Sequence, residues 1–254
     1  KKLASILSSI DSKIELNNKI NDNLSKQIQA AITHFLPYSP EDRIDGWEKV
    51  NLSELALFIG GYSYKGSELL ENKDIAMATI KNFERNGGFK LDGFKEILPS
   101  PKLKPQQTAE LFDILVAHTD LTQNAEVIGN AEVLLTKLKY KKIVFSMDLV
   151  KVLPKNGISK FLLGGILQDN RFKEHCLGYV NGTTVLHLSK NALQAYNLLL
   201  PVQKDDLEPL SNLLKSLYLK LSANIDENVR LEALRDTLLP KLMSGEIDVD
   251  SLDL

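Results

Sequence analysis

Cysteine is nearly absent from this sequence. Cys176 is the only cysteine among 254 residues, so the chain can form no internal disulfide, and a reducing compartment is favoured. No apolar run reaches the ~20 residues that a membrane-spanning helix needs, and no targeting segment is visible. These absences exclude a disulfide-stapled secreted scaffold, predict no membrane partner, and lead us to expect a cytoplasmic protein.

The motifs of cofactor and metal chemistry are also missing. The stretch FIGGYSYKG (58–66) lacks the glycine spacing of a dinucleotide-binding loop, and no phosphate-binding loop is present. The four histidines are scattered, without the spacing of metal ligands. Cys176 directly follows His175, which is too close in sequence for a thiolate–imidazole pair, so we interpret it as a buried structural thiol. We therefore expect no bound cofactor and no metal site.

Three aspartates near predicted strand ends are the remaining candidates for acid–base chemistry: Asp113, Asp120 and Asp148. Isolated aspartates in such places are commonly turn and cap residues, so we expect no catalytic residues. The formal net charge of −2 is unevenly distributed, with a mildly basic middle (43–200) and an acidic end (201–254). This distribution permits a local basic face in the middle of the chain.

The two ends of the chain carry similar apolar patterns. In residues 3–35, and again in residues 210–242, apolar side chains recur at alternating steps of four and three, which is the spacing of a heptad seam. Two asparagines four residues apart interrupt each seam near its middle. They are Asn17 and Asn21 in the first seam, and Asn224 and Asn228 in the second.

An antiparallel alignment of the two seams matches like with like. It places Asn17 opposite Asn228 and Asn21 opposite Asn224, and leaves Arg235 opposite an apolar residue, Ile10. We therefore predict one antiparallel coiled coil whose asparagine layers fix the register. The alternative is two unrelated amphipathic helices that pack on the middle of the chain. The seam is ~50 Å long, which exceeds one turn of duplex DNA, ~34 Å, and would make a rigid spacer.

The middle of the chain has a different pattern. Pro37, Pro40 and Pro201 separate it from the terminal segments, which predicts three parts: 1–37, 38–203 and 204–254. Short β-rich stretches broken by turns lie at 58–66, 74–83, 84–93, 113–122, 142–153 and 178–188. Helical pieces are predicted at 53–58, 104–111, 157–168 and 190–199. The prediction is an α+β domain with a curved or barrel-like sheet, inserted between the two long helices.

Stretches at both ends and in the middle of the sequence are distinctive. They are SSIDSKIELNNKINDNL (8–24) and LRDTLLPKLMSGEIDV (234–249), and between them segments 114–131, 146–152, 178–189 and LLLPVQ (198–203). Together they resemble the specificity (S) subunits of type I restriction–modification systems. The first stretch resembles the central conserved helix of that family, the second resembles its C-terminal conserved end, and the segments between them resemble a target recognition domain. The match covers essentially the whole chain but only half of a usual subunit.

The resemblance implies a role without catalysis. In this family each recognition domain reads one half of a bipartite site in double-stranded DNA, and the conserved helices hold the domains apart and dock the methyltransferase (M) subunits. S-adenosylmethionine, ATP and Mg²⁺ would belong to the M and restriction (R) subunits. With one recognition domain, this chain would be a natural half-subunit that forms a homodimer and reads a palindromic site, or part of a longer subunit.

Two other functions remain open on the sequence. The coiled coil could present a ligand- or protein-binding domain that does not bind DNA. A stand-alone methyltransferase is disfavoured because no cofactor loop is present. Exposed helix charges are candidates for M-subunit docking, although a solvated helix face is the default explanation for them. They are Lys13, Glu15, Glu227, Arg230 and Arg235.

DNA recognition needs lysine or arginine for phosphates, and polar side chains for base edges, on loops that share a face. Four polar turns and one basic pair supply these residue types. The predicted DNA-binding residues are Tyr64, Lys65, Ser67, Lys81, Asn82, Arg85, Asn86, Thr119, Thr122, Gln123, Arg171, Lys173, Thr183 and Thr184. For each turn the alternative is an ordinary solvated loop. The basic stretch KLKYKK (137–142) is equally well explained as a solvated turn.

Overall fold

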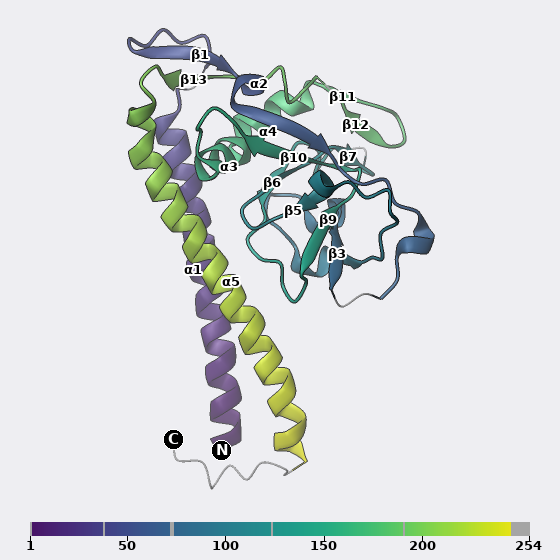
Figure 1. Ribbon diagram of the computed structural model, residues 1–254. Helices are drawn as coiled ribbons and strands as arrows, with labels where there is room; N and C mark the ends of the chain where they lie inside the picture. Colours follow the sequence, from purple (N-terminus) through teal and green to yellow (C-terminus); the bar gives the residue numbers. More distant parts are fainter. Residues whose placement is uncertain (1, 38, 72–73, 123, 190, 245–254) are drawn as a thin grey trace.

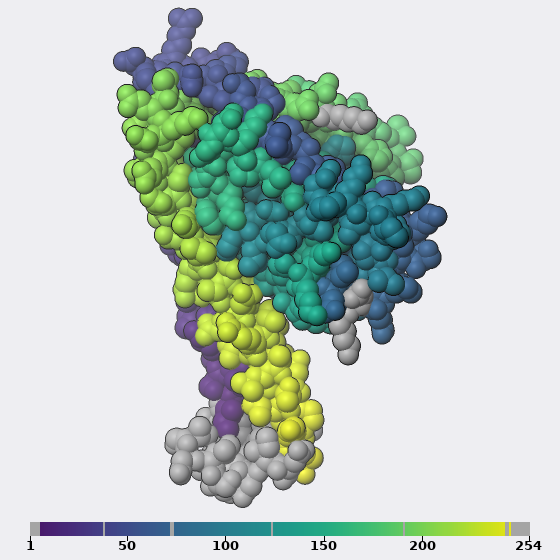
Figure 2. All heavy atoms as spheres, viewed as in Figure 1, coloured from purple at the N-terminus to yellow at the C-terminus, as the bar shows by residue number. Residues whose placement is uncertain are grey.

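The computed structural model describes residues 2–37, 39–71, 74–122, 124–189 and 191–244, and it combines two long helices with a mixed α and β domain (Figure 1). Helix α1 (Lys2–Phe35) and helix α5 (Glu208–Met243) are the long helices. They lie side by side with opposite chain directions, and the domain covers only one end of the pair, so the other end projects beyond it (Figures 1 and 2).

Polar side chains join the two long helices near their middle. Asn17 Nδ2 donates to Asn228 Oδ1 at 2.8 Å, and Asn224 Nδ2 donates to Asn21 Oδ1 at 2.9 Å. These are the pairs that the antiparallel alignment of the sequence brings together. Asn17 and Asn224 are each only 1% exposed, so the hydrogen bonds satisfy amides that water does not reach. The outermost seam pair, at residues 3 and 242, lies outside the described side chains.

Charged residues also bridge the long helices. Arg235 Nη1 lies 3.1 Å from Asp11 Oδ1, and Lys13 Nζ lies 3.4 Å from Glu227 Oε2. The guanidinium of Arg235 therefore reaches a carboxylate of α1 from its position in the seam. Several of the charges that the sequence offers for partner docking are thus engaged in contacts between α1 and α5.

In the described residues, the domain contains four sheets made of short strands. One four-stranded antiparallel sheet has the order β2 (Ala56–Gly60), β10 (Leu149–Pro154), β6 (Ile114–Ala117), β8 (Ala131–Val133). The other has the order β4 (Lys95–Glu96), β3 (Ile75–Ala78), β9 (Lys142–Phe145), β5 (Thr108–Ala109), with β3 and β9 parallel. A three-stranded sheet joins β11 (Val180–Asn181), β12 (Leu186–Leu188) and β7 (Thr119–Asp120). A two-stranded sheet pairs β1 (Trp47–Asn51) with β13 (Asn197–Pro201).

The remaining elements are short helices and helical turns. The α-helices are α2 (Leu52–Leu55), α3 (Lys160–Gln168) and α4 (Asn170–Leu177). The 3-10 turns are η1 (Gly66–Glu68), η2 (Ile80–Asn82), η3 (Leu91–Gly93), η4 (Pro105–Gln107) and η5 (Lys204–Leu207). The predicted mixture of helix and sheet is confirmed. The strand pairings between the described residues form open sheets, and none of these sheets closes into a barrel.

Three predicted helices differ from the structure. The helix expected at 53–58 is α2, which ends at Leu55, and residues 56–58 belong to β2. Residues 104–111 include a 3-10 turn that starts at Pro105 and is followed at once by β5, which pairs with β9. Residues 191–199 lead into β13, which pairs with β1 and whose leucines are buried.

Short apolar runs are compatible with a helix or a strand, and here the pairing with neighbouring strands favours the strand. Helix α4 was not predicted, because its sequence is mostly polar and its two buried residues, Phe172 and Cys176, span a single helical turn.

Helix α3 joins the domain to the long helices through one apolar core. A Cβ added at Gly165 would lie 2.9 Å from Ile32 Cγ1 of α1, and one added at Gly164 would lie 2.8 Å from Val133 Cγ2 of β8. The glycine pair therefore allows α3 to lie closer to both neighbours than any larger residue would. Leu214 of α5 belongs to the same buried cluster. The covered end of the helix pair is thus part of the core of the domain.

We predict that the buried asparagine pair contributes to stability only as a pair. Asn17→Leu leaves the acceptor of Asn228 without its donor, which should lower the free energy of unfolding by about 1–3 kcal/mol. The double variant Asn17→Leu/Asn228→Leu replaces both amides with apolar groups and should be at least as stable as the unaltered chain. Urea unfolding with light scattering measures both stability and mass. Equal stability of the single and double variants would contradict this coupling.

Candidate nucleic-acid interface

The loop that follows β3 is held together by hydrogen bonds between its own polar groups. Asn82 is fully buried; its Oδ1 accepts from Thr79 N at 2.9 Å, and its Nδ2 donates to Lys90 O at 2.7 Å. The amide of Asn82 is therefore a structural part of the loop, whereas the sequence predicted it to contact DNA. The prediction failed because an asparagine in a loop is equally suited to bonding the backbone. Lys81, by contrast, is exposed.

Residues 84–88, which we call the 84–88 turn, project from this closed base. Glu84 N donates to Gly88 O at 2.9 Å, and Gly87 and Gly88 have φ of +85° and +118°, which glycine adopts without strain. The turn presents Arg85 and Asn86 to solvent, and 70% of the Arg85 side chain is exposed. A guanidinium and an amide on one exposed turn are groups that can reach phosphates and base edges.

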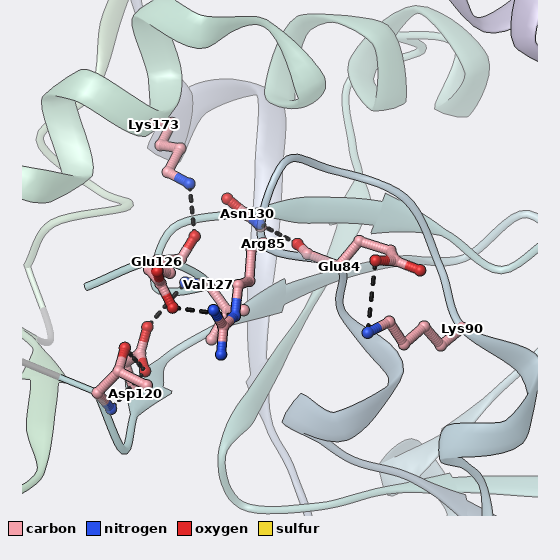
Figure 3. A network of polar contacts seen from close by, with 9 residues as sticks. Glu84, Arg85, Lys90, Asp120, Glu126, Val127, Asn130 and Lys173 are labelled. Atoms are coloured by element: carbon pink, nitrogen blue, oxygen red, sulfur yellow. Dashed lines mark hydrogen bonds and ion pairs between the residues drawn. The ribbon is translucent and has the colours of Figure 1, made fainter. Parts of the chain in front are cut away.

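Side chains of a neighbouring segment, residues 126–132, contact the turn (Figure 3). Arg85 Nε lies 3.1 Å from Glu126 Oε2, and Asn130 Nδ2 donates to Glu84 O at 2.8 Å. Lys173 of α4 reaches the same segment, since its Nζ donates to Glu126 O at 2.7 Å. Burial lowers the pKa of Lys173. Lys173, predicted as a phosphate contact, thus holds α4 against this segment instead of projecting freely into solvent.

Glu132 connects the turn to the helices, and sequence reasoning missed it. The residue is 6% exposed, and its Oε1 accepts from the backbone N–H of Gly88. Its Oε2 accepts from Gln168 Nε2 of α3 at 3.1 Å, and Gln168 Oε1 in turn accepts from the hydroxyl of Tyr218 on α5. Burial raises the pKa of Glu132 to about 7, and the negative charge of Glu84 adds to this effect. The only feature of the sequence that could have pointed to Glu132 is that it is the one acidic residue in an otherwise apolar strand.

The polar groups at β7 are arranged around two carboxylates. Thr119 is buried and donates from Oγ1 to Asp148 Oδ1 at 3.0 Å, while Thr122 donates to Asp120 Oδ1 at 2.8 Å. Burial alone would raise the pKa of Asp120, but hydrogen bonds from Val127 N and Thr122 lower it. These aspartates therefore cap turns. Of the predicted DNA contacts here, Thr122 is partly exposed, Thr119 is enclosed, and Gln123 lies outside the described residues.

The hairpin that carries Thr183 and Thr184 lies beside this turn. In the antiparallel pairing of β12 with β7, Leu186 is opposite Asp120, so both exposed threonines are adjacent to the Thr122 turn. Because Asp120 also accepts from Val127 N, the Thr122 turn is continuous with the segment that supports the 84–88 turn. Three predicted segments are thus brought into one neighbourhood.

The segment 64–67 lies at η1. Tyr64 is partly buried and packs against the cluster that contains Met77, whereas Lys65 and Ser67 are exposed. The backbone of Tyr62 pairs with Ser146, whose hydroxyl donates to Asp148, the residue that also accepts from Thr119 of β7. The aromatic ring of Tyr64 serves the local core, and the exposed Lys65 and Ser67 remain candidates for phosphate contacts.

Arg171 has a structural role at the end of α1. Its guanidinium makes two hydrogen bonds to the carboxylate of Asp169, at 2.6 and 2.9 Å, and it donates to the carbonyl oxygens of Leu36 and Pro37 at 3.1 and 2.7 Å. Leu36 and Pro37 directly follow α1. Arg171 therefore fastens the end of α1 to α4. This corrects its prediction as a phosphate contact, since four of the five N–H groups of the guanidinium donate inside the protein.

A cleft of about 820 Å³ separates the 84–88 turn from the long helices. Its lining includes Lys26 of α1, Arg85 and Asn86 of the turn, Asn130, Gln168 and Lys173. Cationic and amide groups thus border the cleft from both the helix pair and the domain. Glu132 and Tyr218 also line it, so the buried network described above forms part of its wall.

Cysteine, metal-ligating side chains and apolar helices bear on other possible functions. Cys176 is buried, and burial raises the pKa of its thiol to about 12, which confirms the interpretation as a structural thiol. Within the described ranges, no group of three or more His, Cys, Asp or Glu side chains is arranged to hold a metal ion. No helix in those ranges combines the length and apolar character needed to span a bilayer.

Comparison with known proteins places these features in a family. The model described as "Type I restriction modification DNA specificity domain" matches residues 44–227. The type I restriction enzyme MjaIX specificity subunit of Methanocaldococcus jannaschii is 24% identical over 99% of this chain and 59% of its own length. The chain therefore spans somewhat more than half of that curated relative.

Two solved structures are similar to this chain. The S subunit of a type I restriction–modification system from M. genitalium has 18% identity and a TM-score of 0.53, covering 93% of this chain and 56% of the other. The HsdS subunit from Thermoanaerobacter tengcongensis has 17% identity and a TM-score of 0.46, covering 97% and 57%. The first of these likenesses supports the fold of the described residues.

We predict that Glu132 makes stability fall as pH rises. The pKa is near 4.5 in an unfolded chain and about 7 in the fold, where Glu84, Gln168 and Tyr218 face the carboxyl. Between these values the folded state binds more protons, so the free energy of unfolding decreases from pH 5 to pH 8. Glu132→Gln removes this term, and its melting temperature relative to the unaltered chain should rise by roughly a few degrees over that range.

Calorimetry at pH 5 and pH 8 measures this change. Glu110→Gln is the matched control, because the Glu110 side chain is 69% exposed and should follow the unaltered chain at both pH values. A melting-temperature difference between Glu132→Gln and the unaltered chain that does not change with pH would contradict the prediction.

Proposed function

The chain belongs to the type I restriction–modification DNA specificity family, and on that premise we propose that it selects the DNA sequence on which such a system acts. The observation that carries the proposal is the family match over 44–227, which includes the exposed Arg85 turn and its supporting segment. Members of this family select DNA and are not catalytic. S-adenosylmethionine, ATP and Mg²⁺ would accordingly be bound by partner subunits.

The proposed reading surface is made of neighbouring turns. Lys81, Arg85 and Asn86 provide phosphate and base-edge contacts from the 84–88 turn and its base, and Thr122, Thr183 and Thr184 extend this surface along β7 and β12. Arg85 is held by one ion pair with Glu126 while most of its side chain is exposed. A single exposed ion pair contributes little free energy, so exchanging it for a phosphate or a guanine edge costs little.

One chain would read one half of a bipartite site. It spans 59% of the M. jannaschii relative and carries one recognition domain, residues 38–203, between segments 1–37 and 204–254. A second domain would come either from a second copy of this chain or from the remainder of a longer subunit. Two copies related by a two-fold axis would read a palindromic site, because each copy presents the same surface to one half.

The helix pair would set the distance between recognition domains and bind the M subunit. We propose that α1 and α5 form an antiparallel coiled coil, supported by the hydrogen bonds of Asn17 with Asn228 and of Asn21 with Asn224. The 34 residues of α1 span ~50 Å. Beyond the domain, Leu234 is 47% exposed on α5, an apolar contact that a partner helix would cover.

Methylation mapping tests the function. The chain is co-expressed with the methyltransferase subunit encoded beside it, and methylated positions in the host DNA are sequenced. We expect a bipartite motif that disappears when this chain is omitted, and a palindromic motif if two copies act together. A complex that forms without methylation would mean that a second recognition domain is required. If the chain forms no complex with the methyltransferase, the proposal is wrong and an interaction module that does not bind DNA is favoured.

We predict that Arg85 contributes directly to DNA affinity. Arg85→Ala should weaken binding of the assembled complex to its motif by about 1–3 kcal/mol, with relaxed preference at one base pair if the guanidinium reads a base. If it binds a phosphate, affinity falls for all sequences and the salt dependence decreases. Fluorescence anisotropy at two salt concentrations distinguishes these cases.

Arg43→Ala is the control, since Arg43 is exposed between α1 and β1, outside the proposed surface. An affinity, salt dependence and sequence preference of Arg85→Ala that all equal those of the control would remove the 84–88 turn from the reading surface.

A further inference from the structure

Both ends of the 84–88 turn are held by residues of one strand region. At one end Asn130 Nδ2 donates to Glu84 O at 2.8 Å, and at the other Glu132 Oε1 accepts from Gly88 N. The turn itself contributes two backbone hydrogen bonds, from Glu84 N to Gly88 O at 2.9 Å and from Gly87 N to Glu84 O at 3.3 Å. Because Gly87 and Gly88 offer little conformational restriction of their own, the position of Arg85 depends on these outside contacts.

The contact made by Glu132 differs from the others because it continues inward. Its second oxygen accepts from Gln168 of α3, whose own oxygen accepts from Tyr218 of α5. Tyr218 is 1% exposed and Glu132 is 6% exposed, so water does not substitute for these bonds. A continuous chain of three hydrogen bonds therefore runs from the helix pair to the backbone of the turn.

A buried carboxyl at this place needs an explanation other than packing. Neighbouring strand positions are apolar, and an apolar residue at 132 would be buried without the desolvation cost of a carboxyl. The residue facing Glu132 from the turn, Glu84, is itself acidic, so no ion pair accounts for it. What the carboxyl provides is two acceptors in fixed directions, one for the turn and one for α3.

We propose that Glu132 is the positioning residue of the 84–88 turn, and that through Gln168 and Tyr218 it couples the placement of Arg85 to helix α5. This inference rests on the proposed function, since it assigns Glu132 a part in DNA binding by that surface. Glu132 itself touches no DNA; it acts by holding Gly88. Docking of a partner along α5 and DNA contact by the turn would then favour the same arrangement of this network.

Two substitutions at Glu132 separate positioning from packing. Glu132→Ala removes both acceptors. It should weaken binding of the assembled complex to the DNA motif found by methylation mapping by about tenfold or more. Glu132→Gln keeps one acceptor for Gly88, and reorientation of the Gln168 amide satisfies the other end. It should therefore restore affinity to within about twofold of the unaltered complex. Glu110→Ala, an exposed glutamate elsewhere in the domain, is the control.

A double-mutant cycle tests the connection to α5. Tyr218→Phe keeps the buried ring and removes only the hydroxyl that bonds Gln168, and should weaken binding about threefold. If Tyr218 acts through Glu132, the variant Glu132→Ala/Tyr218→Phe should bind no more weakly than Glu132→Ala alone. Losses that multiply in the double variant would overturn the coupling.

Hydrogen exchange provides a reading that needs no DNA. The amide of Gly88 should exchange faster in Glu132→Ala than in the unaltered chain, Glu132→Gln or Glu110→Ala, at a temperature well below every melting point. Normal affinity or normal Gly88 protection in Glu132→Ala would overturn the positioning role while leaving the proposed function intact.

The DNA-binding and exchange measurements together distinguish a failure of this inference from a failure of the proposed function. If the unaltered complex binds no DNA, the proposed function fails. Faster Gly88 exchange in Glu132→Ala would then show that the contact forms but has no role in recognition. In that case the inference falls together with the proposed function. A Glu132→Gln complex as weak as Glu132→Ala would also overturn the inference, because it would mean that the charge and not the acceptor matters.

Discussion

The close packing of α3 against both long helices is the contact on which the rest of the structure depends. Gly164 and Gly165 remove the side chains that would otherwise separate α3 from Val133 and Ile32. This places Leu214 of α5, Ile32 of α1 and the sheet that contains β8 in one apolar cluster. The proposed function requires a reading surface at a fixed position relative to the helix pair, and a shared core provides this more rigidly than a linker.

The same packing brings polar groups together that are distant in sequence. Tyr218 and Glu132 are connected by Gln168 only because α3 lies between α5 and β8. Arg171 of α4 secures the other end of the arrangement, since it donates to the carbonyls of Leu36 and Pro37, the two residues that follow α1. Apolar contact therefore sets the distance between the helix pair and the domain, and directed hydrogen bonds set the orientation. The exposed 84–88 turn inherits that orientation through its contacts with Asn130 and Glu132.

Several residues chosen for DNA binding have inward roles, and the reason is common to all of them. Asn82, Arg171 and Lys173 have the side chains that DNA recognition uses, but each donates to backbone carbonyls of this chain. The groups that recognise phosphates and base edges are also the groups that satisfy the backbone of loops and helix ends. Residue type alone does not separate these uses. Exposure does, and it leaves Lys65, Ser67, Lys81, Arg85, Asn86, Thr183 and Thr184 on the surface.

Residue spacing by itself determined the long helices, the asparagine pairs between them, the α+β character of the middle and the absence of cofactor motifs. These features depend on local periodicity and on residue identity, which a sequence displays directly. Only the tertiary structure decided that 190–199 ends in a strand, that the strands form four open sheets, and that Glu132 lies under the 84–88 turn. Strand pairing and burial arise between segments far apart in the chain, so no local pattern encodes which polar side chain finds a partner and which remains in water.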